Sequence, residues 1–109
     1  MNEKTLEKVT GLSRRQIIML QKTAIKRKGK VVVGISYQYS TEEVEEFMLA
    51  KFFKDCGYNY PEIKIEMDNY RNNKVEVLDK AISKMQGMMS SLKKNLIKAY
   101  ELKDKAEKK

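Results

Sequence analysis

Two adjacent arginines stand at the start of a segment whose side chains could read the edges of DNA bases. Ser13 precedes Arg14, Arg15 and Gln16, and apolar residues then recur at helical spacing. Ser13 and Gln16 have the spacing of a capping box, which predicts that a helix begins here. Arginine pairs with guanine in two places, and two cations beside the positive end of a helix favour an anionic partner. A pair of solvated arginines is the alternative interpretation.

A second group of candidate contacts lies in and before a predicted β-hairpin. The β-branched and aromatic residues around Gly34 predict this hairpin over residues 31–39. Tyr37 and Tyr39 share one of its faces, where they either pack on the following helix or donate their hydroxyl groups to phosphates. The cations that suit non-specific phosphate contacts are Lys26, Arg27, Lys28 and Lys30. A basic loop without a partner is the alternative.

No set of side chains fits catalysis or metal binding. The sequence has no His, and Cys56 is its one cysteine. Histidine-based catalysis, histidine-ligated zinc and intramolecular disulfides are therefore excluded. The four acids Glu42, Glu43, Glu45 and Glu46 suit the start of a helix, and no nucleophile or phosphate loop accompanies them. We expect no enzymatic activity, no cofactor and no metal, and we interpret Cys56 as a buried apolar residue rather than a sensor thiol.

The charge of the chain is concentrated in blocks. Its 109 residues include 23 Lys and Arg against 15 Asp and Glu, which gives a net charge of +8. Residues 1–40 have a net charge of +7, residues 41–72 of −4 and residues 73–109 of +5. A basic balance points to a polyanionic partner, and its separation into blocks favours a nucleic-acid surface over a uniformly solvated one.

Short capped helices are predicted to position the arginines. Residues 3–9 predict a helix that turns Val9 inward, and Gly11 suits the left-handed backbone that ends it. The helix that Ser13 caps is predicted to run to about Lys22. Two helices joined by a tight turn that contains glycine are the outline of a helix-turn-helix.

Two further helices are predicted after the hairpin. Ser40 and Glu43 have the spacing of a second capping box, and Gly57 ends the helix that they begin. Asn59 caps the next helix, in which Pro61 is tolerated in the first turn.

From residue 75 onward the apolar residues repeat in heptads. Four uninterrupted heptads place apolar residues at every a and d position: Val75, Leu78, Ile82, Met85, Met89, Leu92, Leu96 and Ala99. This seam predicts a dimerising coiled coil, because the preceding domain is too small to cover a helix of about 45 Å. The g positions lack charge, so ion pairs between e and g set no chain orientation; they hold Ala81, Met88, Asn95 and Leu102.

Together these elements predict a mainly α fold. A winged helix-turn-helix DNA-binding domain is expected over residues 1–72, followed over residues 73–109 by a long dimerising coiled-coil helix with a Lys-rich tail. The chain opens on charged residues, and its apolar runs are too short to cross a bilayer. One thiol suits a reducing compartment. We therefore expect a cytoplasmic protein without membrane contact.

Three segments of the chain match, in order, the sequence pattern of a known family. They are Thr10-Gly11-Leu12-Ser13-x-Arg15, Tyr39-Ser40-x-Glu42-Glu43-Val44 and Cys56-Gly57-Tyr58-x-Tyr60-x-Glu62-Ile63. In this order the chain resembles the MerR family of bacterial transcription regulators over nearly its whole length. Ser13 and Arg15 fit the DNA-contacting pattern of the family, which usually has Arg-Tyr-Tyr where this chain has Ile18-Met19-Leu20.

The resemblance implies a homodimer, joined by an antiparallel coiled coil, that binds a pseudo-palindromic operator in double-stranded DNA. Members of the family often bend and undertwist promoters, which implies RNA polymerase as a further partner. We expect a short member without an effector-binding domain, acting as a sequence-specific transcriptional regulator. The alternatives are an architectural or excisionase-like DNA-bending protein and a coiled-coil adaptor that binds an acidic protein.

Overall fold

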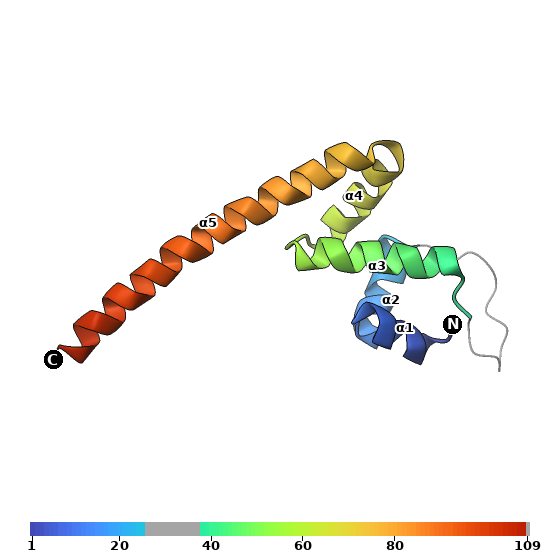
Figure 1. Ribbon diagram of the computed structural model, residues 1–109. Helices are drawn as coiled ribbons and strands as arrows, with labels where there is room; N and C mark the ends of the chain where they lie inside the picture. The colour runs from blue at the N-terminus through green and yellow to red at the C-terminus, as the bar shows by residue number, and fades with distance from the viewer. Residues whose placement is uncertain (26–37, 109) are drawn as a thin grey trace. The chain divides into compact units, whose positions relative to one another are not determined.

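The chain is mainly helical, as predicted. The computed structural model describes residues 1–25 and 38–108, which contain five helices and no strand. They are α1 (Glu3–Thr10), α2 (Arg14–Thr23), α3 (Thr41–Asp55), α4 (Tyr60–Asn72) and α5 (Lys74–Glu107), shown in Figure 1. The hairpin predicted over residues 31–39 lies outside the described residues up to position 37. None of the described helices combines enough length with enough apolar residues to cross a bilayer.

The contacts divide the chain into two units, Met1–Val77 and Leu78–Lys109. The boundary predicted between residues 72 and 73 lies at the end of α4, before the division that the contacts give between Val77 and Leu78. The first unit holds α1 to α4, in which α3 packs against α1, α2 and α4, and α2 also packs against α4. The second unit consists of most of α5, a single uninterrupted helix.

Side-chain caps fix where the first four helices begin. The Asn2 side chain accepts a hydrogen bond from the backbone N–H of Thr5 at the start of α1. Three capping boxes follow, and they confirm the starts predicted from the sequence: Ser13 with Gln16, Ser40 with Glu43, and Asn59 with Glu62. Each such cap stabilises its helix by about 1 kcal/mol, so local sequence alone sets these four boundaries closely.

The core of the first unit gathers large apolar side chains from all four short helices. Its fully buried members include Leu6, Ile17, Leu20, Phe47, Phe53 and Ile63. The prediction that Val9 turns inward is wrong, since 48% of Val9 is exposed. Thr10 is buried instead, and its hydroxyl donates to the Leu6 carbonyl over 2.7 Å. That internal hydrogen bond removes the cost of burying a polar side chain at the end of α1.

Backbone hydrogen bonds join the first residue to the segment that precedes α3. The Met1 amino group donates to the Tyr39 carbonyl over 2.9 Å, and the Tyr39 N–H donates to the Met1 carbonyl over 2.7 Å. This reciprocal pair holds the entrance to α3 against the entrance to α1. Ser40, the cap of α3, follows directly.

Two glycines are expected to respond in opposite directions to substitution by alanine. Gly11 has a φ of +74°, a conformation in which a side chain is strained, so Gly11→Ala should destabilise the first unit by about 1–2 kcal/mol. Gly87 lies within α5 with open space where a Cβ would stand, so Gly87→Ala should stabilise by about 0.5–1 kcal/mol. Urea unfolding followed by circular dichroism measures both changes, and shifts of the same sign would contradict this assignment.

Candidate nucleic-acid interface

A rigid turn sets the direction in which α2 leaves α1. The Gly11 N–H donates to the Glu7 carbonyl over 2.9 Å, which closes the end of α1. The Thr10 hydroxyl oxygen accepts from the Leu12 N–H over 3.2 Å, and the Leu12 side chain is buried in the core. The turn is thus held by backbone bonds, a buried hydroxyl and an apolar anchor. Its geometry matches the tight turn predicted between the two helices.

The start of α2 is fixed by the two residues of its capping box. The Ser13 side chain accepts from the Gln16 N–H over 3.2 Å, and the Gln16 side chain accepts from the Ser13 N–H over 2.9 Å. Both side chains therefore use an oxygen atom to hold the helix. Ser13 remains exposed and Gln16 is half-buried. Ser13 and Gln16, both predicted as DNA contacts, thus fix the start of α2 in the structure.

The exposed side of α2 is basic with an apolar centre. Residues at positions i, i+3 and i+7 share one side of a helix, and here Arg15, Ile18 and Lys22 have this spacing and are exposed. Arg14 is exposed beside them, and α2 contains no acidic residue. We call Arg14, Arg15, Ile18 and Lys22 the α2 face. Ile17 and Leu20 are buried on the opposite side and hold α2 on the core.

Sequence reasoning missed half of the α2 face. It selected Arg14 and Arg15 from their place at the start of the helix, and it left out Ile18 and Lys22. The helical spacing from Arg15 is the signal that would have found both. It becomes decisive once the buried side of α2 is known to contain Ile17 and Leu20.

Arg14 has a partner within the protein. Its Nε lies 3.2 Å from a carboxylate oxygen of Glu3, and 75% of the Arg14 side chain is exposed. The sequence alone indicated no counter-charge for either arginine. The structure provides one for Arg14, the carboxylate of Glu3. Exposed ion pairs stabilise by about 1 kcal/mol or less, so a phosphate can readily replace Glu3. Arg15 is the stronger candidate for contact with a base.

Tyr39 belongs to the core rather than to the exposed surface. Only 4% of it is exposed, and its ring meets Phe47 of α3 edge to face with 5.6 Å between the ring centres. Its hydroxyl oxygen accepts a hydrogen bond from Gln21 of α2 over 2.9 Å. Of the two alternatives for Tyr39, packing on the following helix is therefore the correct one. Through these contacts Tyr39 connects α2 to α3. The other predicted contacts of this region lie outside the described residues: Lys26, Arg27, Lys28, Lys30 and Tyr37.

The first unit thus presents a short capped helix with a basic outer face, set on a core by a tight turn. No protein-family model, curated protein or solved structure matches this chain. Its function is therefore inferred from the residues themselves.

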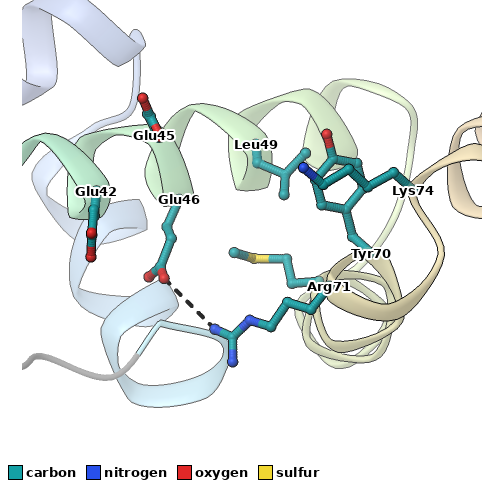
Figure 2. A pocket seen from close by; sticks show the side chains of 8 residues that line it. Glu42, Glu45, Glu46, Leu49, Tyr70, Arg71 and Lys74 are labelled. Atoms are coloured by element: carbon teal, nitrogen blue, oxygen red, sulfur yellow. Dashed lines mark ion pairs between the residues drawn. The ribbon is translucent and has the colours of Figure 1, made fainter.

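A groove of mixed charge lies between α3 and α4. It has a volume of about 410 Å³, and its lining includes the apolar Leu49 and Met67, three acids of α3, and the cations Arg71 and Lys74. Figure 2 shows Glu46 on one side facing Arg71 on the other, with 3.7 Å between their charged atoms. The negative charge predicted for the middle of the chain is therefore gathered on α3, whereas the α2 face is basic.

The predicted dimerisation residues all lie on α5. Several large members of the seam are exposed in the single chain: Val75, Ile82, Met89, Leu92 and Leu96. Leu78 and Met85 are half-buried, and Ala99 is exposed. Met88 and Leu102, beside the seam, are 41% and 54% exposed. The helix therefore presents one long apolar strip.

Cys56 and the acidic residues give no indication of a metal site. Cys56 is buried at the end of α3, where its N–H donates to the Phe52 carbonyl. Among the described residues, no three His, Cys, Asp or Glu side chains are grouped in a way that could hold a metal ion. Burial agrees with the interpretation of Cys56 as a small apolar core residue.

Proposed function

We propose that this chain is a sequence-specific regulator of transcription that binds double-stranded DNA as a homodimer. The observation that carries the proposal is the α2 face, where Arg14, Arg15 and Lys22 are exposed on a capped helix that has no acidic residue. This is the arrangement of a recognition helix, whose first residues contact base edges while its far side packs on the domain. The resemblance to the MerR family supports the same proposal.

The size of α2 suits the major groove of DNA. Its ten residues extend about 15 Å, and the groove is about 12 Å wide and accepts an α-helix. Arg15 lies in the first turn, where the side chains of a recognition helix meet the bases. Lys22 lies two turns later on the same side and suits a phosphate at the edge of the groove. In this arrangement one helix provides both a base contact and a positioning contact.

The apolar strip of α5 supports a second copy of the chain as the dimer partner. The exposed fractions of Val75, Met89 and Leu92 are 70%, 69% and 66%. Water-exposed strips of this kind at heptad spacing are covered when two helices pair. Because every a and d position is apolar, the same strip can serve as both halves of a symmetric interface.

The residues beside the seam are compatible with the antiparallel pair that the resemblance to the MerR family implies. A parallel pair would place Met88 against the partner's Lys93 and Leu102 against the partner's Glu107, but it would also place Lys74 beside the partner's Asp79, so these residues alone do not set the orientation. An antiparallel pair centred on Gly87 places Met88 beside the partner's Met88, an apolar contact. In this register each a residue meets a d residue, so Ile82 opposes the partner's Leu92. Asp79 then approaches the partner's Lys93, which carries the opposite charge.

Selection of bound sequences from a random pool of duplexes tests the proposal. A dimer that reads bases should enrich a palindromic consensus, with half-site centres about 34–36 Å apart. Its affinity for random duplex should fall steeply as salt increases, since phosphate contacts release counterions. Binding without any enriched sequence would instead support an architectural DNA-bending protein. Absence of duplex binding would refute the proposal and favour the adaptor alternative.

Arg15→Ala is expected to weaken binding to the selected duplex by about 1–3 kcal/mol and binding to random duplex much less. The reason is that a bidentate contact with guanine discriminates between bases, whereas a phosphate contact does not. Titration of both duplexes at fixed salt measures the two losses. Arg15→Lys retains the charge without the planar fork, and so it should retain most of the random binding but little of the specificity. Equal losses on both duplexes would assign Arg15 to phosphate.

A further inference from the structure

The centre of the α2 face is an apolar side chain. Ile18 is 38% exposed, with Arg15 three residues before it and Lys22 four residues after it on the same side of the helix. The half-buried Met19 adjoins it. An aliphatic side chain contributes nothing to a phosphate contact. At the centre of a basic face, Ile18 suits a group that is apolar and lies close to negative charge.

The fold holds Ile18 outward. Its neighbours Ile17 and Leu20 are fully buried and fix the rotation of α2 on the core. The capping box at Ser13 fixes where the helix starts, and the Thr23 hydroxyl donates to the Met19 carbonyl over 2.8 Å near its end. A β-branched side chain on a helix has one strongly preferred rotamer. Ile18 is thus a fixed apolar projection rather than a residue that can fold back into the core.

We propose that Ile18 contacts the methyl group of a thymine next to the base pair read by Arg15. The thymine methyl is the apolar group that base pairs present in the major groove, and apolar side chains contact it there. Three residues of helix advance about 4.5 Å, compared with about 3.4 Å between successive bases of one strand. Ile18 therefore reaches one or two base pairs beyond the pair that Arg15 contacts. This inference rests on the proposed function and names the feature of the operator that the α2 face reads.

The cations around Ile18 argue for DNA over a protein partner. Arg14, Arg15 and Lys22 surround it, and α2 offers no acidic residue to a cationic partner. Thymine in the major groove is flanked by phosphates. The DNA surface therefore offers an apolar group to Ile18 and negative charges to the cations around it. Another exposed isoleucine on a short helix, Ile65 of α4, instead has an acid three residues before it and three residues after it on its side of the helix, Glu62 and Asp68.

Replacement of single thymines by uracil in the selected duplex tests the inference, because uracil differs from thymine only by the missing methyl group. When the thymine is replaced in one half-site only, the wild type should bind the uracil duplex about fourfold more weakly, the effect of losing one buried methyl group. Ile18→Ala should bind the thymine and uracil duplexes equally. Ile65→Ala is the matched control and should retain the fourfold ratio. Equal thermal unfolding of the variants confirms that the fold is intact.

The outcomes separate this inference from the proposed function. A protein that selects a consensus but is insensitive to uracil at every thymine overturns the inference and leaves the function standing. A consensus without thymine in the half-site also overturns the inference and leaves the proposed function standing. If Ile18→Ala retains the preference for thymine, another residue reads the methyl group and the inference is wrong. Failure to bind any duplex refutes the function itself.

Discussion

Ile82→Lys is expected to convert the proposed dimer to monomers and to abolish tight binding to the selected duplex. Ile82 lies at an a position of α5, 47% exposed in the single chain and therefore available to a partner. In the dimer the substitution would place one lysine from each chain in a seam from which water is excluded. Each buried unpaired charge costs about 3–5 kcal/mol, and the symmetric dimer would bury two of them. The two α2 helices would then no longer be held one DNA turn apart.

Sedimentation at micromolar concentration measures the first effect, and titration with the selected duplex measures the second. The wild type should sediment as a dimer and Ile82→Lys as a monomer that retains only weak half-site binding. Ser83→Lys is the matched control, since it adds the same charge at the neighbouring, outward-facing b position. It should leave the dimer intact. A monomeric wild type, or Ile82→Lys with full affinity, would refute the proposed architecture.

A second substitution tests the register of the pair. Leu92→Glu alone should also produce monomers. Combined with Ile82→Lys, it should restore much of the dimer if the helices are antiparallel about Gly87, because the introduced lysine of each copy would then face the introduced glutamate of the other. In a parallel pair each introduced lysine would face a lysine, and the double variant would remain monomeric. Rescue therefore distinguishes the two orientations with the same measurement.

The starts of the short helices could be predicted because they depend on interactions within four residues. Ser13 with Gln16 and Ser40 with Glu43 are capping boxes in the structure as well as in the sequence. Gly11 ends α1 in the left-handed conformation that its sequence position suggested. The long helix α5 and its apolar strip could be predicted for a related reason, since heptad spacing on one helix needs no knowledge of the rest of the fold.

The interior faces could not be predicted as well, because they depend on neighbours that are remote in sequence. Val9 is apolar but exposed, and Thr10 takes the buried place because the Leu6 carbonyl accepts a hydrogen bond from its hydroxyl. Tyr39 could have faced DNA or the core on sequence grounds. Its burial follows from Phe47 and from Gln21, which lies 18 residues earlier. For the same reason, Ile18 gained significance only when the buried side of α2 became known.

Phe47→Ala is expected to destabilise the first unit by about 3–5 kcal/mol, the usual cost of removing a large aromatic side chain from a core. Phe47 is fully buried and meets Tyr39 edge to face, and Tyr39 in turn accepts the hydrogen bond from Gln21 of α2. A unit of this size is stable by only about 4–12 kcal/mol. The cavity would therefore remove a large share of its stability and loosen the connection between α2 and α3.

Tyrosine fluorescence during urea unfolding measures this loss, because four of the five tyrosines among the described residues belong to the first unit. Met48→Ala is the matched control. Met48 is the next residue of α3 and is 50% exposed, so its truncation should cost less than about 1 kcal/mol. Phe47→Ala should also weaken binding to the selected duplex, since α2 would lose its fixed direction, while sedimentation still shows a dimer held by α5. If the two variants unfold at the same urea concentration, Phe47 is not the centre of the core and α2 is held by other contacts.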